Sequence, residues 1–113
     1  MQRLNENDMQ ELQQAFSDLL NYDSDDPTEP IDPLNYRDSG GDSCIHIAAL
    51  RGNSHAVELL LKAGINVDDI GEMGCTALHH ASRKGYEDII RLLLDNGAST
   101  DIENDFGKLP LEK

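Results

Sequence analysis

The feature that most constrains this chain is an internal repeat of 33 residues. His79 follows His46 by 33 residues, and Gly97 follows Gly64 by the same interval. The matching residues in the two copies run from Gly41 to Asp68 and from Gly74 to Asp101, and a third copy begins at Gly107. A repeat of this length cannot bury its apolar face alone, so the period predicts units stacked into a solenoid.

Each unit is predicted to form two short helices. Ser43 and Thr76 are typical N-cap residues, and each is followed by a short apolar segment that ends at a glycine. A second segment then carries apolar residues at i, i+3 and i+4, which is typical of an amphipathic helix. The expected helices span residues 44–51, 54–63, 77–84 and 87–96.

These units resemble the ankyrin repeat, which has this period and a Thr-Pro-Leu-His signature. The signature is found here at Ser43–Ala48 and Thr76–Ala81, and in part at Leu109–Leu111. The resemblance implies an all-α ankyrin-repeat solenoid of helix–turn–helix units with β-turn fingers. Its repeats would span residues 38–70 and 71–103, followed by a partial repeat over 104–113. The chain departs from the family pattern at Gly71, where aspartate is usual, and at Cys44 and Ala77, where proline is usual.

Residues 1–37 precede the repeats and are predicted to form a helix and a linker. Apolar residues between Met9 and Leu20 share one face of a helix over about 6–21. Residues 23–33 combine prolines with many acids, a composition typical of an extended linker. Because a solenoid needs its open end covered, the helix is interpreted as an N-terminal cap.

The charge balance favours some partners over others. The chain has 22 acidic and 9 basic side chains, for a net charge of −13. Such a surface repels phosphate backbones and anionic lipid heads, so we expect neither nucleic-acid nor membrane binding. Nine acids and one base lie in residues 1–36. This acidity either keeps the surface solvated or attracts a basic partner electrostatically.

No residue pattern predicts catalysis, a cofactor or a metal site. The resemblance gives His46 and His79 a structural role, in which each binds the hydroxyl of its N-cap residue and nearby loop backbone. Cys44 and Cys75 have no partner motif, and no phosphate-binding loop is present. Because these patterns are missing, we expect a non-enzymatic protein. The N-terminus has no basic region followed by an apolar run, so we expect it to be cytoplasmic.

The resemblance also implies a partner-binding surface, made by the finger tips and the exposed face of the first helices. In this chain the surface would comprise Ser39, Gly40, Asp42, Leu50, Arg51, Ile70, Glu72, Met73, Cys75, Arg83, Lys84, Glu103, Asp105, Phe106 and Lys108. Three of these, Ile70, Met73 and Phe106, are apolar residues in polar turns. A row of exposed apolar residues indicates an interface, with local packing as the alternative.

The predicted function is therefore specific protein binding. The small size and acidity favour an inhibitor that sequesters a basic partner, such as a bacterial immunity-type protein that binds a toxin or nuclease. The alternative is a generic intracellular adaptor or regulatory subunit without an inhibitory role. The partial third repeat leaves the C-terminal end of the stack open. It is covered by the chain's own tail, by a partner, or by a second copy in a homodimer.

Overall fold

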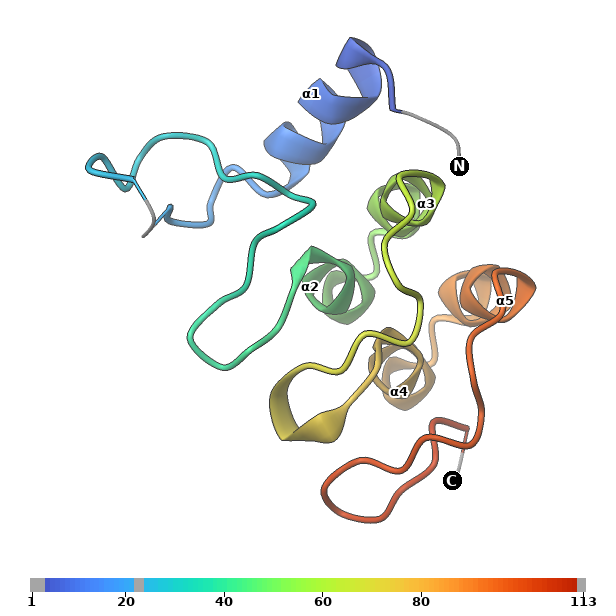
Figure 1. Cartoon of the computed structure of the whole chain (residues 1–113). Helices are drawn as coiled ribbons and strands as arrows, with labels where there is room; N and C mark the ends of the chain where they lie inside the picture. The colour runs from blue at the N-terminus through green and yellow to red at the C-terminus, as the bar shows by residue number, and fades with distance from the viewer. Residues whose placement is uncertain (1–3, 22–23, 112–113) are drawn as a thin grey trace.

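The computed structural model describes residues 4–21 and 24–111. Within them are five α-helices, a short 3-10 helix and an isolated antiparallel bridge between Arg37 and Ser43, with no longer strand. The helices stack in two rows, α2 and α4 in one row and α1, α3 and α5 in the other (Figure 1). The elements are α1 (Glu6–Ala15), α2 (Cys44–Arg51), α3 (Ser54–Lys62), η1 (Glu72–Gly74), α4 (Ala77–Lys84) and α5 (Glu87–Asp95).

The four repeat helices confirm the local signals in the sequence. Ser43 and Thr76 are the N-cap residues of α2 and α4. Both helices end at glycines with left-handed backbone, Gly52 with φ 72° and Gly85 with φ 73°. A side chain is strained in that conformation, so glycine is the natural residue there. The outer helices α3 and α5 each end one residue earlier than predicted.

The core lies between the two rows and continues through both repeats. Four of its fully buried aliphatic side chains occupy equivalent positions in the two repeats: Ile45 and Leu78 on the inner helices, and Leu60 and Leu93 on the outer helices. The 33-residue period of the sequence is therefore also the period of the core.

The N-terminal helix covers the first repeat, but it is shorter than predicted. The expected helix over about 6–21 ends at Ala15, and turns follow. Leu12 and Phe16 are completely buried. Phe16 leaves helical geometry as the C-cap, and Arg51 donates to the Ala15 carbonyl, one of those left free at the helix end. Tertiary contacts with α2 therefore stop the helix.

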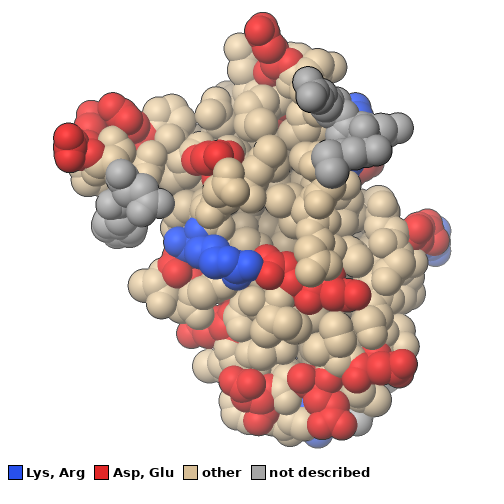
Figure 2. Space-filling view, viewed as in Figure 1, with Lys and Arg blue, Asp and Glu red and all other residues tan. Residues whose placement is uncertain are grey.

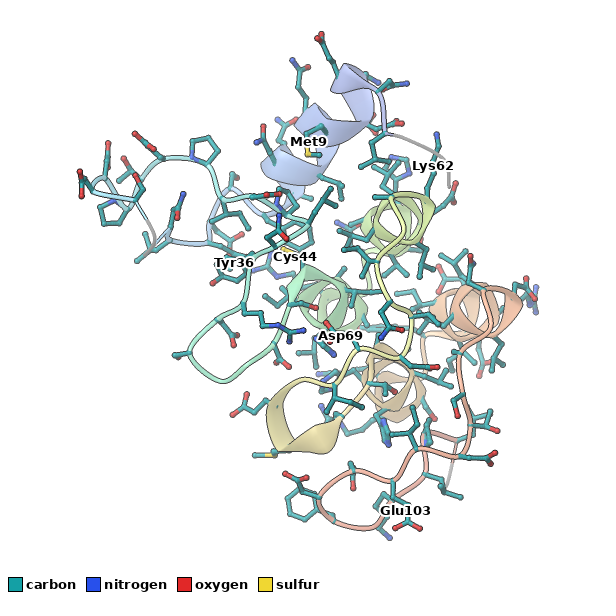
Figure 3. The ribbon with its side chains drawn as sticks, viewed as in Figure 1. Met9, Tyr36, Cys44, Lys62, Asp69 and Glu103 are labelled. Atoms are coloured by element: carbon teal, nitrogen blue, oxygen red, sulfur yellow. The ribbon has the colours of Figure 1, made fainter. Side chains whose placement is uncertain are left out.

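Three charged contacts also join α1 and the turn after it to the first repeat. Asp18 pairs with Arg51 at 2.6 Å, and Glu11 lies 2.8 Å from the His55 ring. Asp8 pairs with Lys62 at 3.3 Å, and Lys62 lies between α1 and α3 in Figure 3. Three of the acids in residues 1–36 therefore form intramolecular pairs that join the cap to the first repeat.

The acidic linker is folded back on itself more than an extended chain would be. Asn21 joins the two ends of this loop: its backbone N–H donates to the Pro27 carbonyl, and its side chain donates to the Pro30 carbonyl. Ile31 then enters the core beside the first repeat. The described part of this loop, residues 24–30, projects away from the helix rows and carries acidic side chains (Figures 1 and 2).

The last described residues fold against α4 without forming a helix. Pro110 is buried, and a turn spans residues 110 and 111. Leu94 and Leu111 remain exposed at this end of the stack. The tail thus covers part of the open end.

Candidate functional site

Three loops project on one side of the stack: two precede the inner helices α2 and α4, and the third follows α5 (Figure 1). We call them the first finger (residues 37–43), the second finger (70–76) and the third finger (103–109). In the first finger the Asp38 carboxylate accepts the N–H groups of Gly40 and Asp42. In the third finger the Asn104 side chain accepts those of Phe106 and Lys108. In these two fingers an acceptor near the start therefore fixes the tip.

The second finger lacks such a side chain, because Gly71 occupies the equivalent position. Its polar acceptor comes from the first finger, where Asp42 Oδ1 accepts the Glu72 N–H at 2.9 Å. A Cβ at Gly71 would overlap this Asp42 oxygen and would lie 2.9 Å from His46 Cε1. The absence of a side chain at Gly71 therefore leaves room for the Asp42 carboxylate.

The tip of the second finger is strained. Met73 has φ 59°, and it is the one described residue other than glycine with positive φ. A side chain in this region costs about 1 kcal/mol or more, and such strain is often found at functional sites. The Met73 side chain is nevertheless 54% exposed, so no burial compensates the strain.

Hydrogen bonds connect neighbouring fingers. Arg37 binds both Asp69 oxygens, at 2.6 and 2.7 Å, and so joins the first finger to the segment before the second. The Asp105 N–H donates to the Met73 carbonyl at 2.9 Å, which joins the second and third fingers. The fingers therefore form one continuous edge.

The two signature histidines have the structural role that was expected. The Nδ1 atom of His46 accepts the Ser43 N–H, and the Nδ1 atom of His79 accepts the Thr76 N–H. Their Nε2 atoms lie 2.7 Å from the Asp69 carbonyl and 3.0 Å from that of Lys108. Both rings are buried and fix finger backbone to an inner helix, so they are not available to a partner.

A groove lies between the third finger and α4. Its volume is about 740 Å³. The residues that line it are Cys75, His79, Ser82, Arg83, Asn104, Phe106, Lys108, Leu109 and Pro110. The third finger forms one side of the groove, and the exposed face of α4 forms the other.

The structure places most of the predicted surface along the finger edge and this groove. Ile70, Met73 and Phe106 are 46%, 54% and 68% exposed. Arg83 and Phe106 line the groove, together with Cys75 and Lys108. The exposed polar residues of the predicted set are Ser39, Glu72, Lys84, Glu103 and Asp105, with Glu103 at the third finger in Figure 3.

Two predicted binding residues have other roles. Asp42 is 5% exposed, because its carboxylate is enclosed by the second finger and His46. Arg51 points to the N-terminal cap, where it binds Asp18 and lies 5.9 Å from the centre of the Phe16 ring. Leu50, beside Arg51, is only half-exposed. We therefore leave these three out of the proposed surface.

The groove also contains residues that the sequence did not indicate. Ser82 and Asn104 lie in it, as do Leu109 and Pro110 of the partial third signature. Ser82 could have been found, because it follows His79 by three residues and so lies on a neighbouring part of the α4 surface. The positions of Leu109 and Pro110 depend on the fold of the tail.

The cysteines give no sign of a nucleophile. Cys44 is the first residue of α2 and is labelled next to Tyr36 in Figure 3, and burial raises the pKa of its thiol to about 12. The thiol is therefore protonated at neutral pH. Among residues 4–21 and 24–111, three or more His, Cys, Asp or Glu side chains do not gather into a potential metal site. The same residues contain no helix long and apolar enough to cross a bilayer.

Comparison with known proteins places this fold among its relatives. The sequence model for ankyrin repeats in three copies matches residues 9–104. Human protein phosphatase 1 regulatory subunit 27 is 44% identical over 70 residues, which are 62% of this chain and 46% of that protein. Mouse protein phosphatase 1 regulatory subunit 12A is 33% identical over 78 residues, covering 69% of this chain and 8% of that protein. A transient receptor potential channel subfamily A member 1 homologue of Caenorhabditis elegans is 39% identical over 72 residues, covering 63% of the chain and 6% of the relative. The chain thus spans less than half the length of each.

Proposed function

Because the chain belongs to the ankyrin-repeat family, we propose that it is a regulatory or adaptor subunit that binds another protein through its second and third fingers and the adjacent groove. One observation carries this proposal. Ile70 at the start of the second finger, and Met73 and Phe106 at the tips of the second and third fingers, are exposed although each is a large apolar side chain. Such a row beside a groove is typical of a binding interface, in which a few apolar residues contribute most of the affinity.

The strain at Met73 supports the same interpretation. A left-handed conformation holds the side chain in solvent, where it makes little use of its apolar surface. The Asp105 N–H bond to the Met73 carbonyl then fixes the tip relative to the third finger. A tip that is fixed before binding loses less conformational entropy when a partner arrives.

The regulatory-subunit role has more support than the toxin inhibitor that the overall charge suggested. Two of the relatives are protein phosphatase 1 regulatory subunits. More than half of the net charge lies in residues 1–36, and three of its acids pair with basic side chains of the first repeat. The acidity therefore has a structural use that requires no basic partner.

Protein phosphatase 1 is the first partner to test. We propose to titrate the purified phosphatase with this chain by isothermal titration calorimetry, using the wild type, Phe106→Ala and Met73→Ala. Each substitution should weaken binding by about 1–3 kcal/mol. Leu20→Ala is the matched control, because Leu20 is also exposed but lies before the repeats. Its affinity should equal that of the wild type.

Affinity capture from cell extract extends the test to other partners. The same four proteins serve as baits, and captured proteins are quantified by mass spectrometry. A true partner should be recovered with the wild type and Leu20→Ala but depleted with Phe106→Ala. If neither the phosphatase nor any captured protein depends on Phe106 or Met73, the finger interface is wrong.

Self-association through the C-terminal end stays a prediction. Leu94 and Leu111 are exposed there, and a second copy is one way to cover them. Sedimentation velocity over a range of concentrations tests this directly. A sedimentation coefficient that stays at the value of a 12.5 kDa monomer over the whole range excludes the homodimer.

A further inference from the structure

We infer that the groove between the third finger and α4 binds a negatively charged peptide segment of the partner that carries an apolar side chain. This inference rests on the proposed function and specifies the chemistry of the partner. It is opposite in sign to what the net charge of −13 suggests. The described residues that line the groove are net positive, unlike the whole molecule.

The described residues that line the groove include two cationic side chains, Arg83 and Lys108, and no carboxylate. One wall, α4, provides Arg83, and the other wall, the third finger, provides Lys108. Both side chains are exposed. Elsewhere acids predominate, and Figure 2 shows them spread over the face in view from the acidic linker to the fingers. Local rather than net charge determines which group enters a groove, so this one favours an anion.

Arg83 is positioned by a buried neighbour. Its Nη2 atom lies 3.3 Å from His80 Nδ1. Burial lowers the pKa of His80 to about 4, so the ring is neutral at physiological pH and Nδ1 can accept from the guanidinium. His80 itself is 6% exposed and cannot reach a ligand. Its contact with Arg83 holds a guanidinium at the edge of the groove, and guanidinium groups bind carboxylates with two parallel hydrogen bonds.

The opposite wall is fixed by backbone contacts. The Lys108 carbonyl lies 3.0 Å from His79 Nε2, which joins the base of the third finger to α4. The Asn104 side chain accepts two N–H groups within the same finger. The walls are therefore held at a defined separation before a ligand arrives, which lowers the entropy cost of binding.

Part of the groove surface is apolar. Phe106 forms an exposed edge, while Leu109 is half-buried and Pro110 is buried. An anion alone would leave this surface in water. A segment with one apolar side chain beside its acidic residues would cover it and gain about 25 cal/mol for each Å² removed from water. Apolar and cationic parts together select an acidic segment with an apolar anchor.

Selection from a random peptide library displayed on phage tests the inference whatever the identity of the partner. Peptides of about ten residues are long enough to cross the groove in extended form. The wild-type chain should enrich peptides with net negative charge and at least one large apolar residue. An enriched pool that is neutral or basic overturns the inference, and so does a selection that enriches nothing.

Charge-reversal variants show where the enriched peptides bind. Arg83→Glu should weaken the binding of an enriched fluorescent peptide by about tenfold or more in fluorescence anisotropy, which corresponds to about 1.4 kcal/mol. Arg91→Glu is the matched control, because Arg91 is equally exposed but lies on α5. Thermal melts should show both variants folded. Equal affinities of the two variants for the peptide contradict the proposed site.

The same peptides separate this inference from the proposed function. If the enriched peptides are basic but lose binding with Phe106→Ala, the finger interface stands and the anionic ligand is wrong. If neither Arg83→Glu nor Phe106→Ala changes the affinity for the peptide, both the groove site and the finger interface are wrong. If the wild type self-associates as its concentration rises and Arg83→Glu does not, the groove binds the acidic linker of a second copy. The inference that it binds a separate partner is then wrong.

Discussion

Gly71 should be the least replaceable residue of the second finger. Its Cβ position is occupied by Asp42 Oδ1, and the His46 ring approaches it from the same side, with Cε1 at 2.9 Å. His46 is completely buried and is bound at both ring nitrogens, so it cannot move away. In Gly71→Ala the Asp42 carboxylate must therefore leave its place, and the Glu72 N–H then loses its acceptor.

The expected loss of stability follows from these contacts. Forcing one methyl group into a closely packed site costs about 1–3 kcal/mol, and loss of a hydrogen bond to a charged acceptor adds about 1–2 kcal/mol. The lower entropy of the unfolded chain returns about 0.5 kcal/mol. We expect Gly71→Ala to lower the free energy of unfolding by about 2–4 kcal/mol, and the melting temperature by about 10 °C.

Urea denaturation followed by circular dichroism measures this loss, and Gly40→Ala is the matched control. Gly40 has the equivalent place to Met73 in the first finger, and its added Cβ would meet the carboxylate of Glu72 at 2.7 Å. Glu72 is exposed and its side chain can swing away, so Gly40→Ala should change stability by less than about 0.5 kcal/mol.

A double-mutant cycle identifies the cause. Asp42→Ala removes the oxygen that the methyl group meets, so Gly71→Ala should cost less in the Asp42→Ala background by about 1 kcal/mol or more. The remaining contact with His46 keeps the rescue partial. If Gly71→Ala leaves the free energy of unfolding unchanged, or if the effects of the two substitutions are additive, the Asp42 carboxylate is not the reason that position 71 requires glycine.

Three further predictions concern single groups. His80 is neutral when folded, because burial lowers its pKa from 6.5 to about 4; Asp42 opposes this shift, and Arg83, His46 and His79 add to it. The unfolded chain therefore binds a proton that the folded chain does not, so the free energy of unfolding should fall by about 2–3 kcal/mol as the pH is lowered from 6.5 to 4. His80→Phe should flatten that dependence in urea titrations, and an unchanged slope would show that another group is responsible. The pKa of His55 is raised by its hydrogen bond to Glu11, so this pair stabilises the cap below pH 6.5 and the effect is lost as pH rises through the folded pKa. Titration of His55 by NMR should show a pKa above 6.5 that returns to its ordinary value in Glu11→Gln. Met73→Gly should raise stability by about 1 kcal/mol, because glycine adopts φ 59° without strain, and yet weaken partner binding; a gain in both, measured by melting and calorimetry, would contradict a binding role for the strained tip.

The sequence predicts most of the fold because its signals are local. An N-cap residue such as Ser43 and a terminal glycine such as Gly52 define α2 within ten residues, and the 33-residue period then applies the same pattern to α4. The N-terminal helix was predicted less well. Its apolar spacing extends to Leu20, but contacts with Arg51, more than 30 residues away, end it at Ala15.

The candidate site could be predicted only in part for the same reason. Met73 and Phe106 were found because an apolar residue in a polar turn is visible in the sequence. Asp42 was expected to face a partner, because nothing in the sequence shows that its carboxylate occupies the space beside Gly71, about 30 residues later. The cationic groove also depends on how the third finger folds against α4, which no local pattern describes.

The acceptor that Asp42 provides for the second finger also bears on how the molecule unfolds. Repeats that contact each other only through apolar faces can unfold one at a time. Here the second finger takes its acceptor from Asp42 of the first repeat, and the Ser99 N–H of the second repeat donates to Asp68 in the first. Fraying of either repeat would leave polar groups of its neighbour without partners. The two repeats should therefore open together, so slow hydrogen exchange in α2 and α4 should report a single shared opening event rather than two independent ones.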